Sequence, residues 1–408
     1  MRKYCYPILV LILSITYLSL VVSYWKGDGY QEKKASSTEL SRVIVDSEYF
    51  VENGLIKTAG INQYTHYPET PAYIIYFLTR ALGFSPLDFA LPFRLLTTVP
   101  LNLVALISIS WLLRKSKWSY LLIIPLFIMV FQKGISHWSG NLEQEAYALG
   151  IGLLGIPLGF FAANRSDFLT PLVYGFVITS FSFDYSIVSG LTFTASYLLR
   201  QSQASYKSSL YCFLFILLGS LSTLFLHFIQ VVCHYNSFAL AFNDLFGSAL
   251  ARMNIFNNLN PHYSTVMRNS LPSNFSYWKT ILTPIWYLPS AASHLFRVVF
   301  LFVAGITSIR LLRFRQRNKS KILIAFLLAF IGLFAWCMLF PNHAQMHNYH
   351  FIPRHSFIFF CFCLVFLVEL ENYEKDLKCQ NSFTHKFEAW VNSLKLNQTN
   401  VKITPKKS

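Results

Sequence analysis

Two carboxylates, Asp46 and Glu48, stand two positions apart in the run VIVDSEYF, which follows the first apolar segment of the chain. A carboxylate close to a hydroxyl group can remove its proton as a general base, and carboxylate oxygens also bind divalent metal ions. We therefore take Asp46 and Glu48 as the candidate catalytic residues. The competing interpretation is a solvated turn, because acidic side chains are mostly exposed in folded proteins.

A second group of polar residues lies near the C-terminus, in the run PNHAQMHNYHFIPRH. Arg354 and His355 follow a proline there, and an arginine binds phosphate oxygens through its planar fork. The spacing of His343, His347 and His350 resembles that of metal ligands, but it also fits an interfacial belt of polar and aromatic residues. The candidate substrate-binding residues of the whole chain are His66, Arg94, Glu143, Arg354, His355 and His350.

Membrane helices must position these residues. Hydrophobic residues make up 54% of the 408 positions and charged residues only 13%, and apolar runs occur from end to end. Every span in a bilayer has to satisfy its backbone hydrogen bonds internally, which a helix does. We therefore predict an all-α fold, a polytopic transmembrane helical bundle of about ten spans.

The net charge of +16 arises from short basic segments between the apolar runs. This distribution indicates membrane topology, because Lys and Arg are retained on the cytoplasmic side, and we expect no nucleic-acid partner. Arg2, Lys3 and the clusters at 114–117 and 310–321 then lie in the cytoplasm. The first apolar segment is longer than the core of a secretory signal, which favours a retained helix over a cleaved signal peptide.

The same path divides the chain into a membrane domain, residues 1–371, and a cytoplasmic basic tail, residues 372–408. Within the membrane domain, 24–92 becomes a first outer loop and 235–290 a second long outer loop. The segment 71–84 is too short to cross about 30 Å of hydrocarbon. We expect it to lie in the interface as an amphipathic helix.

Two further acidic sites interrupt apolar runs. Asp184 stands between two short apolar stretches, which predicts a pair of helices broken near this residue. A carboxylate inside a bilayer is costly unless it is paired or hydrated, so we expect the break to reach the surface. Glu143 and Glu145 precede another apolar run, and their simplest interpretation is the solvent-side end of a helix.

The order of the N-terminal elements resembles the GT-C superfamily of integral membrane glycosyltransferases that use polyprenyl-phosphate sugars. The matching elements are a first helix, DSEYF, then HYPETPAYIIYFL, then GFSPLDFALPFR and a second helix. The resemblance covers about residues 1–200 as an order of elements. Here a serine separates Asp46 from Glu48, where the family often has adjacent acidic residues, and PET replaces a Pro-Pro step, so the choice between the two carboxylates stays open.

The resemblance implies a sugar on a polyprenyl phosphate as donor and an extracytoplasmic glycan, lipid or protein as acceptor. It also implies that Asp46, or else Glu48, acts as the base or positions a metal, and that Arg94 has a structural role at the head of the second helix. A cation such as Arg354 would then stabilise the departing lipid phosphate. No Gly-rich phosphate loop is present, so we expect no nucleotide cofactor, and a divalent metal stays open.

The expected location is a bacterial plasma membrane, with the site facing the extracytoplasmic side. A polysaccharide polymerase or ligase is an alternative, because it would use the same lipid-linked substrates and outer-loop Arg and His residues. A transporter is a further alternative. It would need ionisable residues near the middle of the membrane, and those of this chain fall mostly at predicted helix ends.

Overall fold

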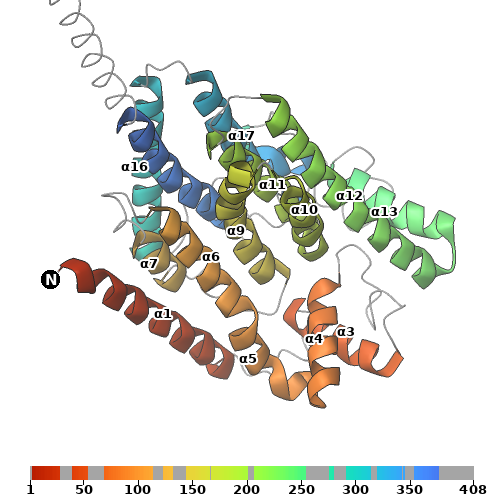
Figure 1. The fold of residues 1–408 in the computed structure, drawn as a ribbon. Coiled ribbons are helices and arrows are strands. Elements are labelled where there is room, and N and C mark those ends of the chain that lie inside the picture. Colours follow the sequence, from red (N-terminus) through yellow and green to blue (C-terminus); the bar gives the residue numbers. More distant parts are fainter. Residues whose placement is uncertain are drawn as a thin grey trace, which may run out of the picture.

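The computed structural model describes residues 2–27, 39–53, 69–113, 123–131, 144–165, 167–200, 206–253, 275–279, 291–313, 319–341, 343–344 and 353–375. All regular elements within these ranges are helices (Figure 1). They are α1 (Arg2–Gly27), α3 (Glu39–Asn53), α4 (Thr70–Leu82), α5 (Pro86–Leu96), α6 (Thr98–Leu113), α7 (Ile123–Phe131), α9 (Gln144–Arg165), α10 (Leu169–Phe181), α11 (Phe183–Arg200), α12 (Tyr206–Tyr235), α13 (Phe238–Arg252), α16 (Ala291–Arg313), α17 (Lys319–Leu339) and the helix Pro353–Lys375.

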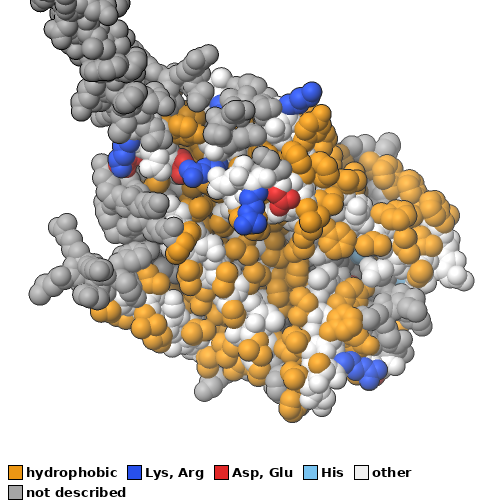
Figure 2. Space-filling model, viewed as in Figure 1, with side chains coloured by type: hydrophobic (Ala, Val, Ile, Leu, Met, Phe, Trp, Pro, Cys, Tyr) orange, Lys and Arg blue, Asp and Glu red, His pale blue; other side chains and the backbone are white. Residues whose placement is uncertain are grey.

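Five stretches in the described part of the chain are long and apolar enough to cross a membrane: Leu91–Leu112, Ala146–Arg165, Lys207–Tyr235, Ser320–Leu339 and Pro353–Lys375. Figure 2 shows a face covered largely by hydrophobic side chains. Leu218 and Phe225 on α12 are among the exposed apolar residues, as expected of a surface that contacts lipid. The prediction of an all-helical, multi-pass architecture is confirmed, and the number of about ten spans stays a prediction.

Tight helix crossings hold the centre of the bundle together. Helix α11 packs between α9 and α17, and α10 packs along α12. A Cβ atom on Gly175 would lie 2.0 Å from the carbonyl oxygen of Ile216, and one on Gly219 would lie 2.0 Å from that of Leu172. Small residues let membrane helices approach this closely, where van der Waals packing replaces the hydrophobic drive of a soluble core.

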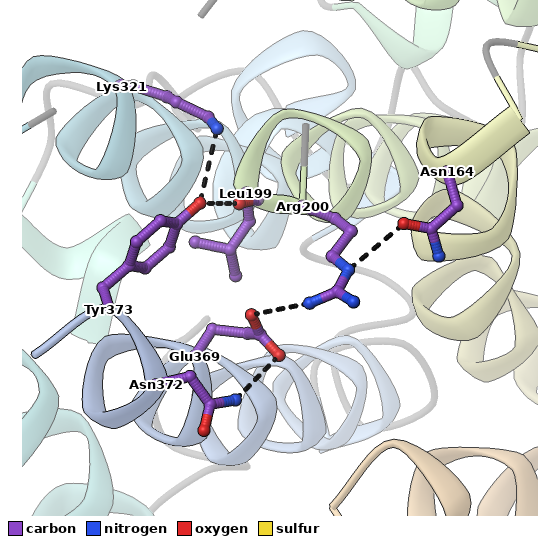
Figure 3. A network of polar contacts seen from close by, with 7 residues as sticks. All are labelled: Asn164, Leu199, Arg200, Lys321, Glu369, Asn372 and Tyr373. Atoms are coloured by element: carbon purple, nitrogen blue, oxygen red, sulfur yellow. Dashed lines mark hydrogen bonds and ion pairs between the residues drawn. The ribbon is translucent and has the colours of Figure 1, made fainter. Parts of the chain in front are cut away.

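One end of the bundle carries a network of polar side chains (Figure 3). Arg200 at the end of α11 lies 3.6 Å from Glu369 and donates to Asn164 at 3.2 Å. Lys321, near the start of α17, donates to Tyr373 at 3.4 Å, and the Tyr373 hydroxyl donates to the carbonyl of Leu199. The ends of α9, α11 and the helix Pro353–Lys375 therefore meet the start of α17. The basic residues predict the same arrangement, in which the spans alternate in direction and their basic ends share one side. That last helix runs past the expected domain boundary at residue 371.

The first loop contains packed helices of its own. Helices α3, α4 and α5 enclose a small apolar core formed by Val43, Ile44, Ala72, Ile75 and Phe93. The segment expected to be an amphipathic helix is α4, which ends at Gly83 with φ of 72°, a left-handed conformation that glycine adopts without strain. The second long loop likewise begins with a helix, α13, that packs against α12.

Candidate functional site

A cavity of about 600 Å³ lies between α10, α11, α12 and α13. Its wall is mostly apolar, and its polar lining includes Asp184, His227, Ser248 and Arg252. Sites for small molecules have the same character, a concave apolar surface of about 300–1,000 Å³ with a few polar groups. The cavity is therefore the candidate binding site within the described residues.

The apolar wall of this cavity reaches the surface of the protein. Five of its lining residues expose 40–51% of their surface: Leu217, Leu221 and Leu224 on α12, and Phe242 and Phe246 on α13. Side chains that line the cavity and are also exposed mark an opening between these two helices. Because the exposed groups are apolar, the opening suits entry from hydrocarbon better than entry from water.

Asp184 reaches the cavity from the break between α10 and α11. This break at Ser182 confirms the expected pair of short helices. The expected surface position of Asp184 is wrong, because its residue is only 4% exposed. Trp336 donates its indole N–H to Asp184 at 2.5 Å, and His343 lies 3.8 Å from the other carboxylate oxygen. These partners offset the cost of burying a carboxylate.

Arg354 and His355 lie beside this cluster, in the interior. The side chains of both residues are fully buried. Arg354 donates to the hydroxyl of Tyr185 at 3.2 Å, and the ring of Tyr185 lies 4.9 Å from that of His355. Arg354 therefore contacts the protein core next to Asp184.

Helix lengths place these groups in one layer. With a rise of about 1.5 Å per residue, Asp184 lies about 24 Å along its helix from Arg200. Trp336 lies about 22 Å from Lys321, and Arg354 lies about the same distance from Glu369. Measured along the helices, the layer therefore lies about 22–24 Å from the network in Figure 3.

The first-loop carboxylates lie on α3. Asp46 is only 1% exposed and Glu48 is half-buried, so the interpretation of a solvated turn is wrong. Arg94, in the last turn of α5, is also buried. It lies close enough to Tyr147 to act on the phenol electrostatically, and the Tyr147 hydroxyl is 3.0 Å from that of Thr97. Arg94 therefore lies where the first-loop helices meet α9.

A side-chain hydrogen bond joins the first-loop helices to the cavity wall. Gln230 on α12 donates to the hydroxyl of Tyr73 on α4. Gln230 follows His227 by three positions, a spacing that places two side chains on neighbouring turns of one helix face. The first-loop helices therefore lie beside the end of the cavity that is remote from the network in Figure 3.

Three of the predicted substrate-binding residues, His66, Glu143 and His350, lie outside the described residues. Within the described part of the chain, no group of three His, Cys, Asp or Glu side chains is placed to hold a metal ion. The structure brings Arg354 and His355 close to Asp184. It places Asp46 and Glu48 on α3 and Arg94 on α5, in the first-loop helices.

Sequence reasoning did not assign His227 or Trp336 to a site. A signal for His227 exists, since its imidazole interrupts the long apolar run of α12, seven positions before His234 in the last turn of that helix. Trp336 offered none, because a tryptophan in an apolar helix is ordinary core or interfacial material.

Comparison with known proteins adds no assignment: no family model, no curated protein and no solved structure matches this chain.

Proposed function

We propose that this chain is an integral membrane glycosyltransferase that takes a sugar from a polyprenyl phosphate and transfers it to a hydroxyl acceptor. The observation that carries the proposal is the cavity with an apolar, exposed wall and the basic residues His227 and Arg252 in its lining. A lipid phosphate combines the two properties that this lining complements, a hydrocarbon chain and an anion. The order of elements in the first loop supports the same class of enzyme.

The cations of the lining suit the change of charge in the reaction. The bond between the anomeric carbon and the phosphate oxygen breaks, and its electron pair leaves with the oxygen. The lipid phosphate thereby changes from a diester with one negative charge to a monoester that carries up to two. Arg252 keeps its positive charge throughout, so it stabilises the departing phosphate more than the bound donor.

A first-loop carboxylate completes the reaction. The acceptor oxygen forms the new bond to the anomeric carbon while its proton passes to Asp46 or Glu48 and then to water. The contact between Tyr73 and Gln230 supports this assignment, because it holds the first-loop helices beside the cavity. Proton transfer of this kind contributes about 10²–10⁴-fold to a rate.

The orientation is part of the proposal. The basic residues of the network in Figure 3 favour the cytoplasmic side for that end. The cavity end and the first-loop helices then face the extracytoplasmic side of a plasma membrane, where a glycan, lipid or protein serves as acceptor. Cysteines at the exposed positions Glu52 and Lys375 should therefore react with a membrane-impermeant maleimide from opposite sides. Labelling from one side would contradict this orientation.

Donor use tests the function. The protein is placed in liposomes with radiolabelled undecaprenyl-phosphate hexoses and pentoses, together with a membrane extract as acceptor source, and donor consumption is measured. We expect consumption by the parent protein and a loss of about tenfold to a hundredfold in Arg252→Ala, the usual cost of a hydrogen bond to a charged group. Arg313→Ala is the matched control, since Arg313 is exposed at the end of α16. A parent protein that consumes none of these donors would contradict the proposal.

A transporter is the second candidate, because the buried pair of Asp184 and His343 is the kind of ionisable group that marks ion pathways inside membranes. The same liposomes separate the two functions. A transporter would move the labelled lipid or a water-soluble solute across the bilayer without breaking the bond between sugar and phosphate.

A further inference from the structure

Asp184 carries a negative charge, whereas the other ionisable residues of the cavity lining, His227 and Arg252, are basic. Arg252 suits the phosphate of a lipid donor, whereas a carboxylate repels that phosphate. If a lipid phosphate occupies the cavity, Asp184 can bind it favourably only through a neutral hydrogen-bond donor elsewhere in the same ligand. The hydroxyl groups of a sugar supply such donors.

Two side chains from outside the cavity lining fix the position of the carboxylate. Trp336 donates to one oxygen of Asp184, and the imidazole of His343 faces the other. The rings of Trp336 and His343 pack edge to face, with centroids 5.2 Å apart. A carboxylate presents about four lone-pair sites, so it can accept hydrogen bonds from the protein and from a ligand at the same time.

We propose that Asp184 binds a sugar hydroxyl of the donor and selects the glycosylated lipid over the free lipid phosphate, with Trp336 and His343 as positioning residues. This assignment rests on the proposed function and deepens it, because it adds a carboxylate that reads the head group while the first-loop carboxylates serve the acceptor. It also assigns a role to the break between α10 and α11. The break brings Asp184 to the cavity from the second residue of α11.

The test compares two binding affinities. Undecaprenyl phosphate and its glucosyl and mannosyl diesters are titrated onto the purified parent protein and onto Asp184→Asn. The amide keeps the shape of the side chain and can still accept from Trp336. We expect the parent to bind at least one glycosylated lipid more tightly than the free phosphate. In Asp184→Asn this preference should fall about tenfold, while the free phosphate binds as well as before or better, since a like charge has gone.

Ser186→Ala is the matched control, because Ser186 also lines the cavity but donates to its own helix, to the carbonyl of Phe183. Its preference should equal that of the parent. Trp336→Phe and His343→Gln should each lower the preference by less than Asp184→Asn does. A general disturbance of the cavity would instead weaken the binding of both lipids equally. The ratio of the two affinities therefore separates a positioning role from structural damage. If Asp184→Asn cannot be purified as a monodisperse protein, His343→Gln decides by the same ratio.

The outcomes separate this inference from the function on which it rests. A parent protein that binds neither form of the lipid would overturn both. A parent that consumes donor and prefers the glycosylated lipid, with the same preference in Asp184→Asn, would overturn the role of Asp184 alone. So would a parent that prefers the free phosphate over both diesters.

Discussion

Gln230 of α12 donates a hydrogen bond to the hydroxyl of Tyr73 on α4, across 157 positions of the chain. Burial raises the pKa of the Tyr73 hydroxyl above its ordinary value, with a further contribution from the charge of Glu69. The hydroxyl therefore stays neutral at any pH at which the protein is handled. The hydrogen bond from Gln230 connects the first-loop helices to the helix that carries His227.

Removing this hydroxyl should loosen the first loop. In Tyr73→Phe we expect thermal stability to fall by about 1 kcal/mol, the usual worth of one hydrogen bond, and donor consumption to fall because Asp46 and Glu48 lose their position. Gln230→Leu should lower thermal stability and donor consumption to the same extent. Tyr76→Phe is the control, since Tyr76 lies one turn further along α4 and packs on the same small core. Equal activity in Tyr73→Phe and Tyr76→Phe would show that the hydrogen bond between Gln230 and Tyr73 does not position the first-loop carboxylates.

The choice between the first-loop carboxylates can be made by amide substitution. If one of them is the base, Asp46→Asn or Glu48→Gln should lower transfer by about 10²–10⁴-fold. Asp46 is buried, so its substitution also disturbs packing, and thermal unfolding must be measured beside activity. Glu52→Gln, at an exposed position of the same helix, should behave like the parent. Full activity in both single variants and in the double variant would remove these residues from the mechanism.

Arg354 should act on stability more than on donor binding. Its guanidinium is buried and donates to the Tyr185 hydroxyl, so Arg354→Ala should destabilise the protein by about 1.5–3 kcal/mol. Arg354→Lys keeps the charge but loses the planar fork, and we expect an intermediate effect. Tyr185→Phe and the double variant complete a cycle whose effects should not add, because the two side chains interact. If Arg354→Ala is fully stable yet binds donor poorly, the arginine contacts the lipid after all.

The crossing of α10 and α12 should tolerate no added methyl group. Gly175→Ala and Gly219→Ala would each bring a Cβ atom to 2.0 Å from a backbone carbonyl oxygen of the facing helix. We expect a loss of stability of about 1–3 kcal/mol or more, and weaker donor binding because both helices line the cavity. Gly305→Ala is the matched control in another helix, since a Cβ there meets nothing within 4 Å. Unfolding midpoints equal to that of Gly305→Ala would contradict the tight crossing.

The sequence by itself determined the class of structure, the positions of several helices and the break near Asp184. These are local properties. An apolar run can satisfy its backbone hydrogen bonds only as a helix in a bilayer, and the alternation of basic segments follows from the cost of moving charges across it. Apolar runs such as 207–235 and 320–339 therefore predicted helices that the structure contains. The basic segments likewise predicted that the helix ends near Arg200 and Glu369 lie on the same side of the bundle.

Only the tertiary structure decided which polar residues are buried and which share a site. Asp184 meets Trp336 across 152 positions, and Arg354 meets Tyr185 across 169. No local pattern encodes such a contact, because it depends on how several helices pack together. A single sequence therefore left Asp184 at an expected surface and did not indicate the contact between Arg354 and Tyr185. Packing turned both into interior groups, since a buried charge becomes tolerable once neighbouring helices supply its hydrogen-bond partners.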